Sequence, residues 1–195
     1  MYGNVQFNKL NRSAGVFIGG TQISPLIKPV TELPEVAAFT VGVNTLSIPR
    51  NSTATIPAGD FLRIEIGRES VVRFSGGIYN ATALRIDSAA TVSFSAPTVI
   101  NVTQDLVIED NSSLTGTTVG ASDVVINYSG TNTVAVGANA ILYARIIAPN
   151  AAVVLGRGGE YRGFVAASEV SVGQTGKLSS DDASASSHVD PFRRR

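Results

Sequence analysis

Residues 63–74 read RIEIGRESVVRF, and residues 83–94 read ALRIDSAATVSF. Each stretch holds two alternating apolar pairs separated by a short turn that ends in a small residue. Side chains alternate across a strand, so each apolar pair marks a strand with one buried face. The small residue between the pairs fits the tight inside of a corner. In the first stretch the apolar residues are Ile64, Ile66, Val72 and Phe74, and the small residue is Ser70.

The first apolar pair of this unit recurs seven times along the chain. The second members of the pairs are separated by 18, 20, 22, 18, 22 and 18 residues. Near-constant spacing of alternating segments is typical of stacked strands, each buried by its neighbours in the stack. The sequence therefore predicts an all-β fold, a right-handed parallel β-helix of about seven rungs. The pairs are Leu46-Ile48, Ile64-Ile66, Leu84-Ile86, Leu106-Ile108, Val124-Ile126, Ile146-Ala148 and Phe164-Ala166.

The composition excludes several classes of protein. Fifteen Lys and Arg balance fifteen Asp and Glu among 195 residues, so no excess of charge favours nucleic acid or an anionic membrane. The absence of cysteine excludes disulfides, cysteine-ligated zinc and a cysteine nucleophile. No apolar stretch is long enough to span a bilayer, and residues 1–10 lack the apolar core of a secretory signal.

Three zones follow one another in the sequence. Residues 1–43 contain Pro25, Pro29 and Pro34 and only a weak strand pattern, so we expect an N-terminal capping or packing segment. The repeat fills residues 44–178. Residues 179–195 form a linker and tail rich in Ser and Asp. The open edges of a strand stack invite further pairing unless they are covered, and the first zone is the natural cap.

One side of the predicted stack changes from polar to apolar. With the seven pairs pointing inward, the residues between them point outward: Ser47, Glu65 and Arg85 come first. A contiguous apolar patch on a soluble protein usually has a partner. Two partners fit this one: the segment Val36 to Val43 with Phe39, or another subunit. The interface candidates are Val107, Val125, Ile147 and Val165.

Oxygen-bearing side chains gather at one predicted corner. Asp87 and Glu109 take the same position in adjacent rungs, Asp110 follows, and Asn127 is expected in the next rung. Stacking would bring them within about 5 Å, so they form a weak calcium candidate. Alternatively, these side chains cap local backbone amides, as Asp and Asn commonly do in turns.

No residue pattern indicates a catalytic group or a bound cofactor. His188 is the only histidine, which excludes a metal site built on several histidines. Thr-x-Thr occurs at residues 53–55, 115–117 and 131–133 without forming a regular array, so ice binding by a flat threonine ladder is weakly supported.

Several longer motifs resemble a known family. Residues 144–173, ARIIAPNAAVVLGRGGEYRGFVAASEVSVG, resemble the C-terminal part of a bacterial extracellular β-solenoid domain. That domain occurs in adhesin-like and pilus-associated surface proteins. The segments IPAGDFLRIEIG (56–67), FSGGIYNATALRI (74–86) and HVDPF (188–192) are similar to other parts of the same domain. The resemblance implies an extracellular or cell-surface role in architecture or adhesion, and it brings no active site.

The leading hypothesis is thus a non-enzymatic structural or adhesive surface protein that self-assembles into oligomers or filaments. Its partners would be copies of itself or a cell-surface polymer. A polysaccharide-binding or polysaccharide-cleaving module is the alternative, with Arg85, Asp87 and Glu109 as its nucleus. A third hypothesis is a bactofilin-like intracellular polymer, which the missing signal peptide would allow.

Overall fold

The computed structural model describes residues 10–12, 17–18 and 33–179. Almost all regular structure in these residues is β-strand, with a single 3₁₀ turn, η1. The elements are β1 (Leu10–Arg12), β2 (Phe17–Ile18), β3 (Thr45–Ile48), β4 (Thr53–Ile56), β5 (Gly59–Ile66), β6 (Val71–Phe74), β7 (Gly77–Ile86), β8 (Thr91–Phe94), β9 (Thr98–Ile108), β10 (Ser113–Gly116), η1 (Ala121–Asp123), β11 (Val124–Tyr128), β12 (Val134–Val136), β13 (Ile141–Leu155), β14 (Glu160–Val172) and β15 (Lys177–Ser179).

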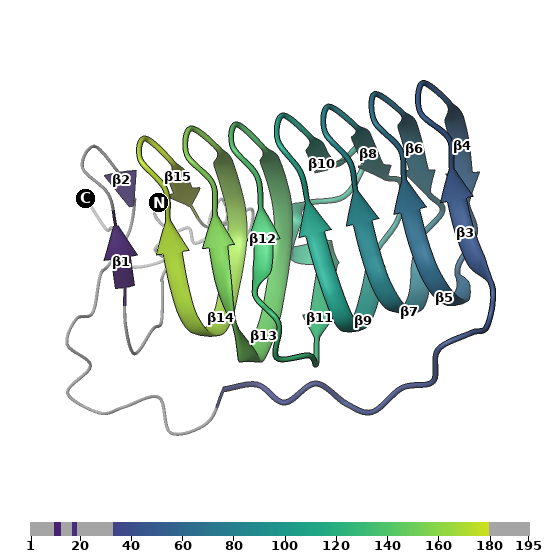
Figure 1. Cartoon of the computed structure of the whole chain (residues 1–195), viewed down its shortest axis with the longest axis horizontal. Helices are drawn as coiled ribbons and strands as arrows, with labels where there is room; N and C mark the ends of the chain where they lie inside the picture. The colour runs from purple at the N-terminus through teal and green to yellow at the C-terminus, as the bar shows by residue number, and fades with distance from the viewer. Residues whose placement is uncertain (1–9, 13–16, 19–32, 180–195) are drawn as a thin grey trace, which may run out of the picture.

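Every strand pairing among these elements is parallel, and the chain winds into a β-solenoid of about seven turns (Figure 1). The fold prediction is confirmed. Each turn contributes to three faces, defined by which strands pair. The first face runs β3, the second halves of β5, β7 and β9, then β12, the last parts of β13 and β14, and β1. The second face runs β4, β6, β8, β10, the starts of β13 and β14, β15 and β2. The third face runs the first halves of β5, β7 and β9, then β11 and the middle parts of β13 and β14.

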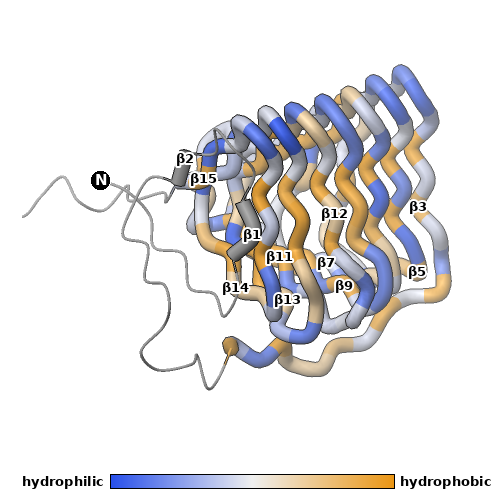
Figure 2. The backbone as a smooth tube through the Cα atoms, turned by 60° about the vertical axis from the view of Figure 1, so that its left-hand side comes forward, coloured by the Kyte–Doolittle hydropathy of each residue, from blue (hydrophilic) through white to orange (hydrophobic). Residues whose placement is uncertain are grey.

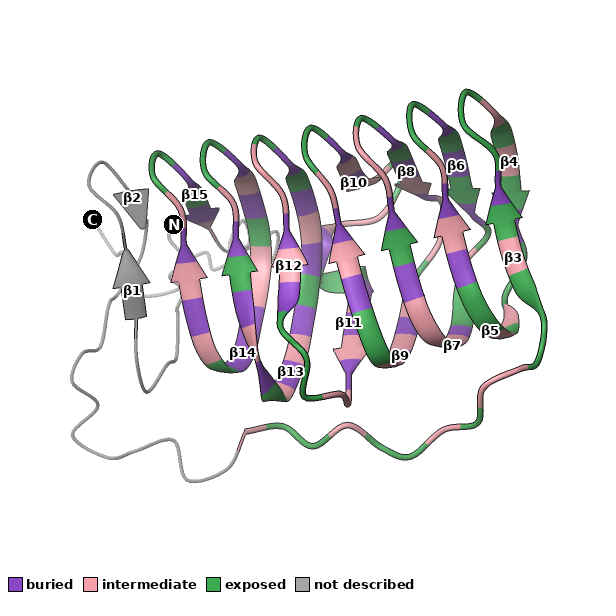
Figure 3. Cartoon of the chain, viewed as in Figure 1, coloured by how far each residue is buried: buried purple, intermediate pink, exposed green. Residues whose placement is uncertain are grey.

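The core consists of columns of apolar side chains that point inward from the three faces. Burial alternates along each strand, as the bands of Figure 3 show, and apolar residues alternate with polar ones in the same way in Figure 2. Each large side chain removed from water in such a column contributes about 1.5–3 kcal/mol. One first-face column consists of Ile48, Ile66, Ile86, Ile108, Val136, Leu155 and Val172.

Seven equivalent turns connect the first face to the second. Each turn contains one residue with φ between 55° and 68°, the left-handed conformation that closes the corner. The residue after it is small, because the inside of the corner is tight. The corner positions predicted at Ser52, Ser70, Ala90 and Ser112 are confirmed, whereas those at Gly130 and Ala152 are wrong. The left-handed residues are Asn51, Glu69, Ala89, Asn111, Asn139, Gly158 and Thr175.

The fifth turn of the stack is longer than the others, and this overturns part of the predicted register. Its left-handed residue, Asn139, comes 28 residues after Asn111. The extra residues include η1 and β11, which extend the third face. Val124 and Ile126 therefore stack on Thr98 and Ile100 rather than on the Leu106 column. The first face continues instead through β12, so equal spacing of apolar pairs did not mean one continuous column.

The beginning of the chain lies at the far end of the stack. β1 pairs with β14 and β2 with β15, so the N-terminal strands add to the last turn. Residues 33–44 run lengthwise beside the solenoid toward β3, where the first turn begins (Figure 1). The Gly42 N–H donates to Phe61 O at 3.2 Å, and the Leu62 N–H donates to Asn44 O at 2.8 Å. The tail expected at residues 179–195 lies outside the described residues after Ser179.

Burial of Tyr161 makes the stability of the solenoid sensitive to alkaline pH. Its hydroxyl donates to Gly156 O at 3.1 Å, and the side chain is 2% exposed. Burial raises the pKa of Tyr161 to about 12; the bond to Gly156 opposes the shift and the charge of Asp110 adds to it. The unfolded chain ionises Tyr161 near pH 10, so the folded state binds this proton more tightly.

We expect the free energy of unfolding to fall by about 3 kcal/mol between pH 10 and pH 12 on account of Tyr161, with no such loss below pH 10. Denaturant titrations at several pH values, repeated on Tyr161→Phe, measure this contribution. The phenylalanine variant should lose less stability over the same interval. Parallel pH profiles for the two proteins would contradict the assignment.

Candidate functional surface

The outward side of the first face changes character along the stack. One column begins with polar residues, becomes apolar for three successive turns and ends polar. Val107, Ala135 and Val154 form the apolar part, here named the apolar strip, and Val154 is 40% exposed. The whole column is Ser47, Glu65, Arg85, Val107, Ala135, Val154 and Ser171.

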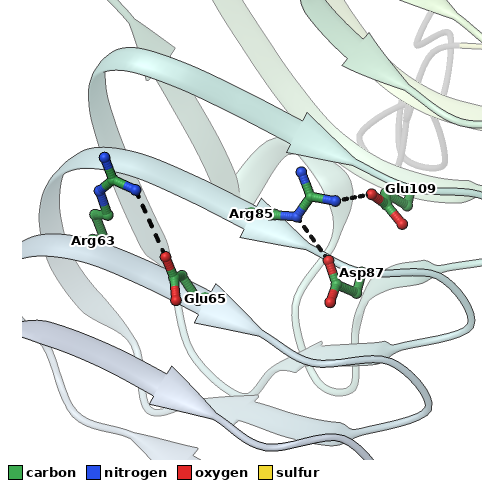
Figure 4. Close-up of polar contacts among 5 residues, drawn as sticks. All are labelled: Arg63, Glu65, Arg85, Asp87 and Glu109. Carbon is green, nitrogen blue, oxygen red and sulfur yellow. Dashed lines mark hydrogen bonds and ion pairs between the residues drawn. The ribbon is translucent and has the colours of Figure 1, made fainter.

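Arg85, the residue before the strip in this column, joins two carboxylates from neighbouring turns (Figure 4). Its Nε donates to Asp87 Oδ1 at 2.8 Å, and its Nη2 donates to Glu109 Oε1. The hydrogen bond to Asp87 raises the pKa of Arg85, burial opposes the increase, and the charge of Glu109 adds to it. In the preceding turn Arg63 lies 3.9 Å from Glu65. Exposed ion pairs of this kind orient side chains and contribute little stability.

A surface cavity of about 370 Å³ lies beside this cluster. Val107 and Ala135 of the apolar strip line it, together with the carboxylate-bearing residues Glu109 and Asp110. Gly137 closes the next turn, where a Cβ atom would overlap the backbone and carboxylate of Asp110. Without that Cβ, Asp110 Oδ1 accepts the Ala138 N–H at 2.7 Å. The cavity thus combines apolar lining with acidic groups at its margin.

The predicted calcium candidate is only partly assembled. Asp87 and Glu109 do occupy the same position in adjacent turns, but the guanidinium of Arg85 bridges them. Asp110 caps a backbone amide, which is the alternative interpretation of this corner. Asn127 lies on the third face and stacks on Asn101, so its expected place in the corner is wrong. Within the part of the chain that the structure describes, no three His, Cys, Asp or Glu side chains are placed to hold a metal ion.

The four predicted interface residues do not share a column. Val107 lies in the apolar strip of the first face, whereas the other three belong to the third face. Val125 stacks between Val99 and Arg145, and Ile147 follows Asn127. Val165 is 7% exposed and stacks inward on Ile146, so its outward assignment is wrong. The long fifth turn is the physical reason, because it moved these segments to another face.

The third face carries a ladder of amide side chains that the sequence analysis did not find. Asn127 Nδ2 donates to Asn101 Oδ1 at 2.8 Å, and Asn101 Nδ2 donates to Asn80 Oδ1 at 2.7 Å. Asn80 Nδ2 then donates to Asp60 Oδ1 at 2.6 Å. Stacked amides of this kind tie neighbouring strands together outside the core. The signal available in the sequence was an oxygen-bearing residue recurring at intervals of 20, 21 and 26 residues.

The outward side of the second face mixes hydroxyl groups with charges. One of its columns runs Thr55, Arg73, Ser93, Thr115 and Tyr143. Arg162, the residue next to Tyr143 in this column, lies 4.7 Å from the Tyr143 ring centroid and 3.1 Å from Glu160. A flat array of threonines is thus not present on the described part of this face.

Comparison with protein-family models places the whole solenoid in one family. Residues 31–179, about three quarters of the chain, match the family described as "Putative Ice-binding-like adhesive domain". The chain belongs to this family. The match begins before the first turn of the stack and ends at its last strand, β15. Membership agrees with the resemblance to adhesin-like β-solenoid domains seen in the motifs above.

The ice-binding-like adhesive domain family indicates a structural or adhesive role, and with it a surface or extracellular location. No curated protein and no solved structure matches the chain. Among the described residues the structure contains no helix with the length and hydropathy needed to cross a bilayer.

Proposed function

We propose that this chain is a non-catalytic adhesive module that acts outside the cell or at its surface. The observation that carries the proposal is the match to an adhesive domain over residues 31–179, which includes every turn of the stack. The solenoid serves as a rigid support, because each turn is hydrogen-bonded to its neighbours along all three faces. Such a support presents side chains of adjacent turns at a regular spacing.

The contact surface that we propose is the first face from Arg85 to Val154. Three successive turns expose the apolar strip there, and the cavity beside it adds depth. The acidic groups of Glu109 and Asp110 border the apolar lining. An apolar centre with a polar margin is the usual anatomy of a binding patch, since burial supplies affinity and the charged margin supplies orientation.

The partner that we propose for this surface is an immobilised surface polymer. Beads coated with the protein measure its adhesion to immobilised polysaccharides, to protein-coated surfaces and to bare plastic. The double variant Val107→Asp/Val154→Asp places charge in the apolar strip. We expect it to reduce bead retention at least about tenfold, because charged groups resist burial.

The matched control is Thr55→Asp/Thr91→Asp, which adds the same charge at exposed positions of the second face. It should retain wild-type adhesion, and circular dichroism verifies that both variants are folded. Wild-type beads that adhere to none of the surfaces would contradict the adhesive function. Equal loss in both double variants would leave the function standing and remove the first face as its site.

One observation favours a narrower function, the binding of an acidic polysaccharide: Arg85 stands at the edge of the cavity, ion-paired to Asp87 and Glu109. Arg85→Ala should then abolish retention on uronic-acid polymers while leaving retention on neutral polymers unchanged. Release of shortened oligosaccharides from the polymer would show cleavage rather than binding.

We also propose that the module associates with copies of itself. β3 and β4 each pair on one side only among the described strands, with β5 and β6, and unpaired strand edges favour association. Light scattering and negative-stain electron microscopy over a concentration series test this. Oligomers or filaments are expected as concentration rises, and a monomer at every concentration would contradict self-association.

A further inference from the structure

The last turn of the solenoid is completed by strands from the beginning of the chain. β1 aligns with the end of β14, with Leu10 opposite Val170 and Arg12 opposite Val172. β2 aligns with β15, with Ile18 opposite Leu178. About 160 residues separate the paired strands in sequence. The exposed edge of β14 and β15 is therefore an acceptor for strands that the neighbouring turn does not supply.

The pairing between donor and acceptor strands is short. β1 has three residues and β2 has two. The pairs inside the stack are longer, since β13 and β14 align over twelve residue pairs. Few backbone hydrogen bonds hold so short a strand, and elements with few contacts open at low free-energy cost. The N-terminal strands thus separate from the acceptor edge far more readily than any inner turn unwinds.

The connection that follows β2 is long enough for the same strands to serve another molecule. Ile18 lies at the last turn and Thr45 begins the first turn, so the connection joins opposite ends of the stack (Figure 1). It contains 26 residues. An extended chain of that length reaches about 85 Å, whereas seven turns spaced as neighbouring strands occupy about 35 Å.

We infer that the edge of β14 and β15 is a strand-acceptor site that also binds β1 and β2 of a second copy. Copies then associate by exchanging their N-terminal strands. Reciprocal exchange between two copies closes a dimer, whereas serial exchange produces an open chain of molecules. The inference rests on the proposed self-association and names its route. It is independent of the adhesive surface on the first face.

Disulfide trapping tests this exchange, and the chain has no native cysteine to interfere. Asn11 is aligned with Ser171 across β1 and β14. Neighbouring strands lie about 4.8 Å apart, within the Cα separation that a disulfide tolerates. Asn11→Cys and Ser171→Cys are placed on separate chains that carry tags of different size. The chains are mixed at high concentration and oxidised, and the mixed dimer is quantified on a non-reducing gel.

The matched control pairs Asn11→Cys with Ser47→Cys, which lies in the same outward column at the opposite end of the stack. A third protein carries Asn11→Cys and Ser171→Cys in one chain and reports the pairing within a single molecule. We expect the first mixture to give at least about five times more mixed dimer than the control. The single-chain pair should form an internal disulfide at low concentration.

Each other outcome overturns the inference in a distinct way. An internal disulfide without mixed dimer would show that the N-terminal strands serve only their own chain. A dominant link between positions 11 and 47 would show end-to-end stacking of intact solenoids. Absence of every link would show that β1 does not occupy the acceptor edge. Oligomers in light scattering together with any of these results would leave self-association standing by another route.

Discussion

Replacing Phe94 by alanine should lower the free energy of unfolding by about 3–5 kcal/mol, in the range for a fully buried phenylalanine. Phe94 points inward from the second face and has no exposed surface. Its ring centroid lies 5.4 Å from that of Phe74, which in turn packs edge-on against Tyr79 at 4.8 Å. The next residue in this column is Gly116, so no side chain of the following turn can fill the space.

Denaturant unfolding followed by circular dichroism measures this loss. The matched control is Phe164→Ala, which removes the same atoms from an outward, half-buried position on the third face. The Phe164 ring lies 5.7 Å from the guanidinium of Arg145, so the control loses that contact and some burial, about 1 kcal/mol in all. Equal losses in the two variants would contradict the columnar core.

Gly163→Ala should cost about 2–4 kcal/mol, because the new Cβ atom has neither the backbone conformation nor the space it needs. Gly163 has a φ of +134°, a region that side chains of L-residues rarely adopt. A Cβ atom there would overlap the carbonyl oxygen of Ala144 on the paired strand and approach its carbonyl carbon at 2.8 Å. The strand would have to shift away from its neighbour, which breaks the register of β13 and β14.

Gly59→Ala is the matched control for this substitution. Gly59 also begins a third-face strand, but its φ is not positive and an added Cβ would lie 3.7 Å from the Phe61 ring, an ordinary contact. Alanine also reduces the freedom of the unfolded chain, so this control should be neutral or slightly stabilising. Thermal melts of the two variants give the comparison. A Gly163→Ala protein as stable as the control would show that the β13–β14 pairing tolerates a side chain there.

Much of the fold was predictable because its signals are local. Alternation of apolar and polar residues around Ile64, Leu84 and Leu106 marks strands without reference to any neighbour. Small residues such as Ser70 and Ala90 mark the tight corners for the same reason. The prediction failed where the fifth turn departs from the common length. From Val124 onward the apolar pairs kept their spacing while they moved to the third face.

The candidate surface was only partly predictable. The ion pairs of Arg85 with Asp87 and Glu109 follow from stacking of adjacent turns of regular length, and the sequence placed those carboxylates together. The cavity did not follow, since it depends on Ala135 of β12 lying beside Val107. The amide ladder on Asn101 was missed because its members are separated by unequal numbers of residues.

The sequence by itself determined that the chain forms parallel stacked strands, about where each corner lies in the first four turns, and which side chains fill their core. Those properties depend on strand alternation and corner size, which act within a single turn. Only the tertiary structure decided which strand lies beside which after the long fifth turn, and that β1 and β2 close the last turn. Lateral pairing depends on how each turn closes and on hydrogen bonds between residues far apart in sequence, so no local pattern encodes it.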